Sequence, residues 1–171
     1  MYKNCITILF LLFIMSVNNS ATAQNSLTKL EGTWYVNMSN FKMWLKGNKL
    51  YPKFNYTLQT KRDITGLKDV VSYIKNEKKK TIVGFDKPEN TSATKFTWRG
   101  KGLLFLFKSK WEILYQTDQY TVIHFEKTLA TAEGYDVISR QKSFDEATIS
   151  TIRTKLKELG ITKELTVIKQ E

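Results

Sequence analysis

Cysteine and histidine are almost absent from this chain of 171 residues. The one cysteine is Cys5, and the one histidine is His124. Cys5 lies inside a leader-like N-terminus, so the chain that follows has no cysteine for a disulfide, a thiolate metal site or a nucleophile. No carboxylates cluster at metal-ligand spacing either. The sequence therefore predicts no metal site, no cofactor and none of the usual parts of zinc-dependent or nucleophilic catalysis.

Three other features that could support catalysis have simpler interpretations. His124 lies between Ile123 and Phe125 in a predicted strand, where a wall position facing solvent or a satisfied core position is the simpler interpretation. Asp118 is interpreted as a turn cap. The segment Gly100-Lys101-Gly102 is too short for a phosphate-binding loop, and no helix follows it. We therefore expect no catalytic residue.

Long apolar runs are absent beyond the N-terminus. Residues 1–23 combine a basic start at Lys3, an apolar stretch from Ile6 to Val17 and the small-residue pattern Ala21-Thr22-Ala23. This arrangement predicts a secretory signal peptide that is cleaved before Gln24. The alternative is a membrane anchor, but about twelve apolar residues fall short of the roughly twenty that span a bilayer. We expect one exported domain over residues 24–171, soluble in a periplasm or outside the cell.

Residues 33–140 alternate between short strand-like segments and turn residues. Apolar residues recur at every second position, so Phe54, Tyr56 and Leu58 share one face of a strand. The connections are too short for parallel crossovers, so neighbouring strands are expected to be antiparallel. Eight such strands form an up-and-down barrel, with a two-sheet sandwich as the alternative. The predicted strands are Thr33–Met38, Phe54–Thr60, Val70–Ile74, Thr81–Phe85, Lys95–Arg99, Lys110–Gln116, Tyr120–Lys127 and Tyr135–Arg140.

One amphipathic helix is expected after the last of these strands. Apolar residues recur at helical spacing over residues 144–159, which predicts a single apolar stripe. Ser143 and Glu146 form a capping-box pattern, and Gly160 supplies a stop signal. The stripe is expected to pack on the outside of the sheet, and Leu165–Ile168 could add a final strand.

Three motifs occur in a fixed order along the chain. Gly32-Thr33-Trp34 opens the first predicted strand, Thr117-Asp118-Gln119-Tyr120 precedes a late strand, and Arg140 ends the last one. This order of G-x-W, T-D-x-Y and Arg, followed by a helix, resembles the lipocalin family of the calycin superfamily, as a bacterial-type secreted protein. The resemblance implies an all-β fold, an eight-stranded up-and-down antiparallel barrel with one C-terminal α-helix packed outside. It implies a structural signature of Gly32, Trp34, Thr117, Asp118, Tyr120 and Arg140, in which Arg140 covers Trp34 at a plugged end of the barrel.

The resemblance also implies that inward side chains line a pocket for one small hydrophobic molecule. The chain has 10 Phe, 4 Trp and 8 Tyr, which is many for its size, and a filled core would account for some of them. The period of two nominates Phe54, Tyr56, Leu58, Phe96 and Trp98 as candidate ligand-binding residues. The alternative for each is ordinary core packing, or an outward position under the helix.

Positive charge exceeds negative charge, with 27 Lys plus Arg against 16 Asp plus Glu. In an up-and-down barrel the first, third, fifth and seventh connections lie at one end, which is the open mouth in lipocalins. Most of the excess lysine falls in these four connections. The candidate mouth residues are Trp44, Phe105, Phe107, Lys79 and Lys101. The opposite end, which is assigned Asp63, Asp86, Glu89 and Asp118, is predicted to be close to balanced.

An apolar and basic mouth suits an amphiphile with an acidic head, or peripheral contact with an anionic membrane. The alternative is a solvated lysine-rich surface. We predict an exported binding protein that carries a small hydrophobic or amphiphilic ligand, such as a fatty acid or lysolipid. A loop-mediated interaction module with a filled barrel is the second hypothesis, and a lipid- or isoprenoid-modifying enzyme is the third. Nucleic-acid binding is not expected, because aromatics that alternate along strands suit an interior better than a stacking platform.

Overall fold

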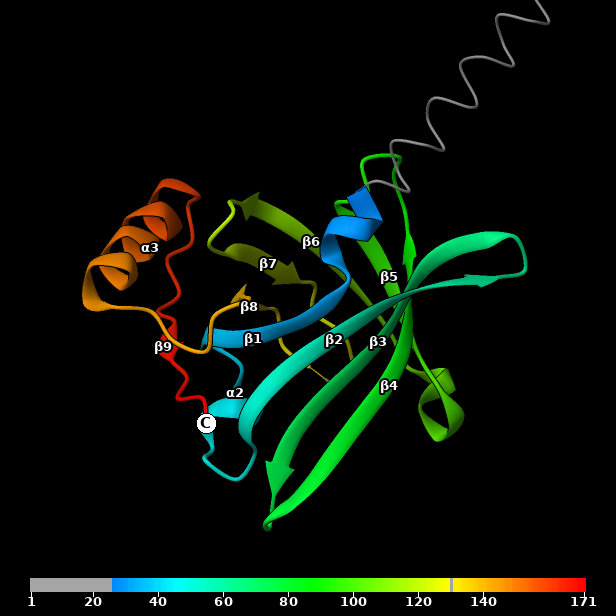
Figure 1. The fold of residues 1–171 in the computed structure, drawn as a ribbon, viewed down its shortest axis with the longest axis horizontal. Helices are drawn as coiled ribbons and strands as arrows, with labels where there is room; N and C mark the ends of the chain where they lie inside the picture. The colour runs from blue at the N-terminus through cyan, green and yellow to red at the C-terminus, as the bar shows by residue number, and fades with distance from the viewer. Residues whose placement is uncertain (1–25, 130) are drawn as a thin grey trace, which may run out of the picture.

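Residues 26–129 and 131–171 are described by the computed structural model, and the predicted leader, residues 1–23, lies outside them. Their strands follow one another around a closed sheet, and a short last strand lies beside the first (Figure 1). The strands are β1 (Gly32–Ser39), β2 (Leu50–Lys61), β3 (Ile64–Lys75), β4 (Lys78–Pro88), β5 (Lys95–Gly100), β6 (Lys108–Gln116), β7 (Thr121–Phe125), β8 (Gly134–Ser139) and β9 (Thr166–Val167). Beyond the helical residues 26–30, the helices are α2 (Lys42–Leu45), the 3₁₀ helix η1 (Gly102–Leu106) and α3 (Glu146–Glu158).

The barrel is closed because β1 pairs with both of its ends. On one side β1 is antiparallel to β2, with Trp34 opposite Phe54, and on the other side it is antiparallel to β8, with Val36 opposite Ile138. Every intervening pair is antiparallel and consecutive in sequence. Such closure leaves no long unpaired edge in the sheet formed by the described residues. The predicted eight-stranded up-and-down barrel is therefore confirmed, and β9 provides the final strand expected near Leu165–Ile168.

The three strands β2, β3 and β4 extend well beyond their predicted bounds. Arg62 and Asp63 form the tight turn between β2 and β3, and Asn76 and Glu77 form the turn between β3 and β4. All four residues have φ between 47° and 65°, as two-residue hairpin turns of the right twist require. Polar residues next to these turns interrupt the apolar alternation but pair through their backbones. Hydropathy alone therefore underestimated the strand lengths.

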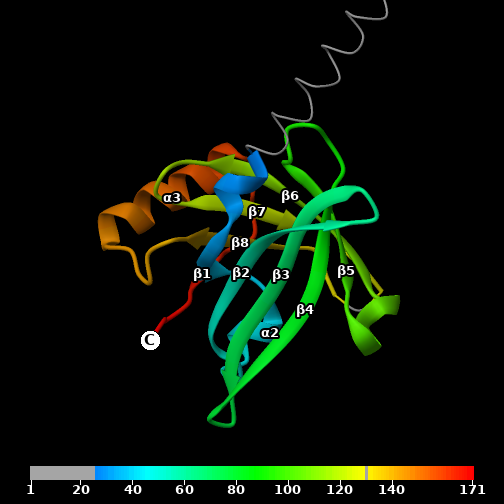
Figure 2. The ribbon, with the colours of Figure 1, turned by 45° about the vertical axis from the view of Figure 1, so that its right-hand side comes forward.

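The alternate connections gather at the two ends of the barrel. The turn between β3 and β4, α2 and η1 all lie at one end, and both views agree on this arrangement (Figures 1 and 2). The helical residues 26–30 and the connection between β4 and β5 lie at the other. We call the end with α2 and η1 the mouth and the other the closed end.

Helix α3 packs outside the barrel, as predicted. Ile149, Ile152 and Leu156 are buried in a cluster with residues on the outer faces of β1, β7 and β8. The helix begins later than the capping-box pattern predicts, because its N-cap is Asp145 and not Ser143. The Asp145 carboxylate accepts from the Thr148 N–H at 2.7 Å. The cap prediction for Ser143 is therefore wrong. Across the residues described, no helix is both long and apolar enough to traverse a bilayer.

Two β-bulges divide the side chains between an inner core and an outer core. The register shifts between Val36 and Met38 in β1, and between Ile113 and Tyr115 in β6. Residues two apart normally share a face, but an extra residue in one strand reverses the face of those that follow. Val36 and Ile113 consequently pack inside the barrel, whereas Met38 and Tyr115 pack in the cluster with α3.

Trp34 fills the closed end. Its side chain is buried, and its indole N–H donates to the Leu30 carbonyl at 2.7 Å. The Arg140 guanidinium lies 3.8 Å from the centroid of the Trp34 ring, so the contact expected from the sequence is present. Arg140 also donates to three backbone carbonyls, those of Lys29, Glu31 and Thr33. These bonds hold the chain leading into β1 across the bottom of the barrel.

The T-D-x-Y motif forms the turn between β6 and β7. The Thr117 hydroxyl accepts from the backbone N–H groups of Gln119 at 3.2 Å and Tyr120 at 3.1 Å. The cap assigned to Asp118 from the sequence is thus made by Thr117, whose side-chain oxygen reaches the next turn of backbone. Tyr120 is buried in the outer core, with its ring centroid 6.4 Å from that of Phe144. The motif therefore supports the contact with the α3 region.

Candidate ligand-binding site in the barrel

A cavity of about 150 Å³ lies inside the barrel next to the mouth. Residues from α2 and from the connection between β7 and β8 contribute to its wall, so it sits at the mouth rather than at the closed end. Aromatic rings form much of the wall. They belong to Phe41, Trp44, Phe54, Tyr56, Trp98, Trp111 and Phe125.

Three of the five candidate pocket residues line this cavity. Phe54, Tyr56 and Trp98 are on its wall, whereas Leu58 and Phe96 are not. The Leu58 N–H donates to Glu31, which places Leu58 at the closed end, and Phe96 is buried behind Trp111 with ring centroids 4.2 Å apart. A period of two identifies which face a residue occupies but not its depth along the barrel. Leu58 and Phe96 were predicted to line the pocket, but they do not line this cavity, and ligand contact stays a prediction for Phe54, Tyr56 and Trp98.

Of the five candidate mouth residues, only Trp44 lines the cavity. Trp44 is buried on α2, whereas Phe105 and Phe107 are about half exposed on and beside η1. Lys79 in β4 and Lys101 before η1 are exposed as well. The fifth connection folds into η1 and stays outside the barrel, so its apolar side chains do not reach the interior.

Sequence reasoning missed three aspartates that are buried inside the barrel. Asp69, Asp86 and Asp136 are 5%, 0% and 1% exposed, and Asp69 and Asp136 line the cavity. The assignment of Asp86 to the surface of the closed end is wrong, because β4 continues to Pro88 and carries Asp86 inward. The alternation of side chains along the strand could have identified Asp69 as an inward residue. It lies two residues from Leu67 and from Val71, which both face inward.

Each buried aspartate lies near a different tryptophan. The Trp111 indole N–H donates to Asp86 Oδ1 at 2.6 Å. Trp98 lies near Asp69, and Ser39 and Trp44 lie near Asp136, where they partly oppose the rise in pKa that burial of each carboxyl causes. Each carboxyl group therefore has a neutral donor beside it.

Gly84 makes one of these pairs sterically feasible. It lies opposite Asp69 on β4, and a Cβ atom at this position would be 2.1 Å from Trp98 Nε1. Real Cβ atoms do not approach a ring nitrogen this closely, so any larger residue would displace the indole from the strand. Glycine at this position therefore lets the Trp98 ring lie across the sheet toward Asp69.

The environment of the three aspartates favours their protonated forms. Burial raises the pKa of Asp136 to about 7 and that of Asp86 to about 7, against the downward effect of their hydrogen bonds. Burial and then the charge of Asp86 raise the pKa of Asp69 well above its usual range. Among the described residues, one oxygen of each carboxyl group has no hydrogen-bond partner: Asp69 Oδ1, Asp86 Oδ2 and Asp136 Oδ1.

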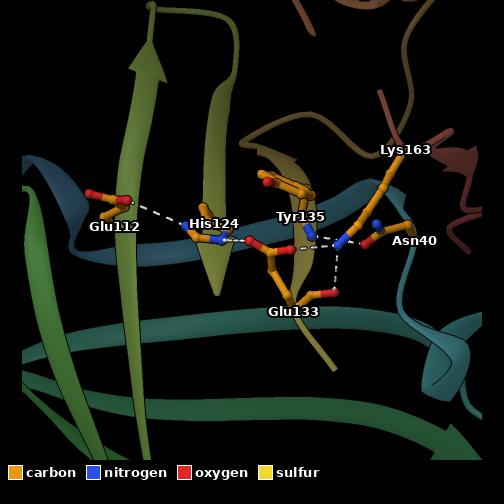
Figure 3. Close-up of polar contacts among 6 residues, drawn as sticks. All are labelled: Asn40, Glu112, His124, Glu133, Tyr135 and Lys163. Carbon is orange, nitrogen blue, oxygen red and sulfur yellow. Dashed lines mark hydrogen bonds and ion pairs between the residues drawn. The ribbon is translucent and has the colours of Figure 1, made fainter. Parts of the chain in front are cut away.

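His124 lies outside this site, in a chain of polar contacts on the outer wall (Figure 3). Its Nδ1 is 3.3 Å from Glu112 and its Nε2 is 2.9 Å from Glu133, which in turn binds Lys163 at 2.7 Å. The imidazole stacks on Tyr135 with ring centroids 4.8 Å apart. Both ring nitrogens are therefore engaged, in agreement with the interpretation of His124 as a satisfied wall residue. No group of three or more His, Cys, Asp or Glu side chains in the described ranges could hold a metal ion.

A closed eight-stranded antiparallel barrel with one helix packed outside and a plugged end is the lipocalin fold. No family model matches the sequence, and no curated protein matches it either.

Solved structures show the likeness in three dimensions. Lobster apocrustacyanin A1 matches with a TM-score of 0.59 and 12% identity, over 91% of this chain and 87% of that one. The cockroach allergen Per a 4 matches with a TM-score of 0.61 and 16% identity, over 84% and 87%. The siderocalin Ex-FABP matches with a TM-score of 0.58 and 16% identity, over 82% and 94%. At these identities the likeness establishes the fold, and the function has to be argued from the site.

Proposed function

We propose that this protein is a binding protein, not an enzyme, and that it holds one small ligand with an apolar body inside the barrel. The observation that carries the proposal is the aromatic-walled cavity of about 150 Å³ beside the mouth. A protein of this fold that binds ligands is the siderocalin Ex-FABP, which functions through dual ligand specificities. Export is part of the proposal and is inferred from residues 1–23 alone; a mature chain that begins at Gln24 would support it.

The cavity volume sets the size of the ligand. Sites for drug-sized molecules measure about 300 to 1,000 Å³, whereas an engineered apolar cavity of about 150 Å³ binds benzene. The cavity therefore suits one ring with a short substituent. A fatty acid or lysolipid, the ligand class expected from the sequence, would leave much of its tail outside the mouth.

Ethylbenzene is expected to bind to the purified protein with a dissociation constant of about 10 to 100 μM, as suits a buried ligand of about eight non-hydrogen atoms. Isothermal titration calorimetry measures the affinity, and a ligand-dependent rise in Tm provides a second readout. Ile82→Trp on the cavity wall should abolish binding by filling the space. Thr81→Trp, at the exposed neighbouring position in β4, is the matched control.

Two results would count against this proposal. Equal binding to the Ile82→Trp and Thr81→Trp variants would place the ligand outside the barrel. Absence of binding by ethylbenzene and by fatty acids of any length would favour an interaction module with a filled barrel.

The mouth supports a second proposal, that it docks on an anionic membrane surface. The apolar residues of η1 are exposed, with Leu103 at 98% and Leu106 at 81%. Leu129 is fully exposed and lies in the same surface depression as Lys108 and Lys127. Apolar side chains surrounded by lysines complement a lipid surface, where each basic residue contributes about 1 kcal/mol.

Vesicles that contain phosphatidylserine should therefore sediment the protein, and vesicles of phosphatidylcholine alone should not. We expect the double substitution Leu103→Ser and Leu106→Ser to reduce binding about tenfold or more, because it removes the apolar contact. Ile64→Ser, a partly exposed position at the closed end, is the control. Equal loss in the control, or binding that ignores the lipid charge, would refute docking through the mouth.

A further inference from the structure

We propose that the ligand of this cavity is a small organic cation, an ammonium group on an apolar ring, whose charge lies between Asp69 and Asp136. This inference rests on the proposed function, since it names the chemical class of the molecule that the barrel holds. It departs from the acid-headed amphiphile expected from the basic mouth. The wall of the cavity carries acidic side chains, whereas the lysines around its entrance are basic.

The first argument is the pair of unused acceptors on the wall. Asp69 and Asp136 both line the cavity, and within the described part of the chain their Oδ1 atoms have no hydrogen-bond partner. Trp98 lies near the Asp69 carboxyl and Trp44 near that of Asp136, where each partly opposes the rise in pKa that burial causes. A buried oxygen without a donor is unfavourable, because the loss of its hydration is not compensated. An ammonium group has three N–H donors and no acceptor, and so complements both buried oxygens once the carboxyl groups rotate toward the cavity.

The second argument is the charge of the wall. Among the described residues that line the cavity, the charged types are Asp69, Glu126 and Asp136, and none is Lys, Arg or His. Lys49 lies outside the wall, with its Nζ 6.0 Å from the centroid of the Trp44 ring. An anionic head inside the cavity would meet acids alone. A cation would meet compensating charge in a site of low dielectric constant, where the interaction is strong.

The third argument is the aromatic surface. Trp44, Trp98 and Trp111 line the cavity together with Phe54 and Tyr56. A cation over the face of an aromatic ring is attracted by the ring, most strongly when the ring is tryptophan. The same rings provide the apolar surface for the body of the ligand. Rings alone would hold a neutral molecule equally well, so it is the combination with the carboxyl groups that defines the cation.

Binding of a cation should be coupled to loss of protons. Without a ligand, burial holds the pKa of Asp136 at about 7 and that of Asp69 well above its usual range. A cation favours the ionised form, so affinity should rise as the pH increases through this range. The other titratable groups around the carboxyls are Tyr56 from β2 and Asp86 from β4, with Glu126 on the wall and Lys49 behind Trp44. Tyr56 has a raised pKa and stays a neutral donor here.

Three probes of similar shape test the inference by calorimetry. Benzylammonium and ethylbenzene differ only in an ammonium group against a methyl group, and phenylacetate carries the opposite charge. At about pH 8 benzylammonium is expected to bind at least tenfold more tightly than ethylbenzene, and phenylacetate should not bind. The affinity for benzylammonium should fall about tenfold between about pH 8 and about pH 6, because a carboxyl with a pKa of about 7 becomes protonated over this range. Binding of benzylammonium near pH 7 should release protons. Repeating the calorimetric titration in buffers of different ionisation enthalpy measures the number of protons released.

Isosteric variants locate the charge. Asp136→Asn and Asp69→Asn should each lower the ratio of benzylammonium affinity to ethylbenzene affinity tenfold or more. Asp63→Asn, in the exposed turn between β2 and β3, is the control and should change neither. Retained ethylbenzene binding shows that a variant is folded, and the wild-type comparison of the three probes needs no variant.

The outcomes separate this inference from the proposed function. If ethylbenzene binds and benzylammonium binds no better, the inference is overturned and the proposed function stands. If neither binds, the proposed function itself fails. Tight benzylammonium binding that is unaffected by both Asp→Asn substitutions, or that releases no protons, would overturn recognition by the carboxyl groups.

Discussion

Asp136→Asn is expected to stabilise the ligand-free protein by up to about 4 kcal/mol at about pH 8. Asp136 is buried, and its pKa rises from 3.8 to about 7 on folding, a difference of roughly three units at about 1.4 kcal/mol each. Below about pH 4 the carboxyl is protonated in both states. As the pH rises from about 4 to 7, the unfolded chain loses this proton while the folded chain keeps it, so the stability falls. An asparagine has the shape of the protonated carboxyl and does not titrate.

Urea unfolding between about pH 5 and pH 8 measures this effect. The free energy of unfolding of the wild type should decrease across the range, and that of Asp136→Asn should decrease less, with Asp86 supplying a remaining slope. Glu112 and Glu133 have lowered pKa values, through hydrogen bonds to Lys95 and Lys163, and act with the opposite sign below this range. Asp63→Asn again serves as control. A wild-type stability that is flat or rises with pH would refute a buried carboxyl with a raised pKa.

Trp34→Ala is expected to lower the free energy of unfolding by about 3 to 5 kcal/mol. Removing a buried indole loses its transfer energy and leaves a cavity. At this position it also strips the Leu30 carbonyl of its donor and the Arg140 guanidinium of the ring beneath it. This loss is a large share of the 5 to 15 kcal/mol that stabilises a typical domain, so the variant should be only marginally folded at 37 °C.

Trp34→Phe distinguishes the parts of this contact. It keeps a ring under Arg140 and removes the indole N–H, so a cost of about 1 to 2 kcal/mol is expected. Urea unfolding at about pH 6 compares both variants with the wild type. A cost below about 1 kcal/mol for Trp34→Ala would mean that the closed end does not depend on this ring.

The positions of the charged residues explain why the net charge of the molecule is a poor guide to its ligand. Most of the lysines that produce the net charge of +11 are exposed on the outside of the molecule, where water screens them. Asp69, Asp86 and Asp136 contribute only three residues to that count, but they occupy the interior, where water does not screen them. A count of charges therefore described the surface, and position decided the character of the cavity.

Local patterns in the sequence indicated the antiparallel strands and the helix α3, because the period of two and the apolar stripe depend on residues that are close together. These patterns left a two-sheet sandwich open. The choice of a barrel with a closed end came from the order of Gly32, Trp34 and Arg140, through the resemblance to lipocalins. The ends of strands were less well determined, because polar residues such as Lys78 pair through backbone atoms and leave no hydropathy signal.

Only the tertiary structure decided which inward residues meet at the cavity. Phe96 and Trp98 alternate alike in the sequence, yet one packs behind Trp111 and the other reaches the cavity because Gly84 on the next strand leaves room. Asp69 and Asp136 come from strands at opposite ends of the barrel sequence. Closure of β1 onto β2 and β8 brings them to one cavity, and their indole partners come from distant segments. Side-chain direction follows from local geometry, whereas depth, partners and burial follow from how the closed sheet brings distant strands together.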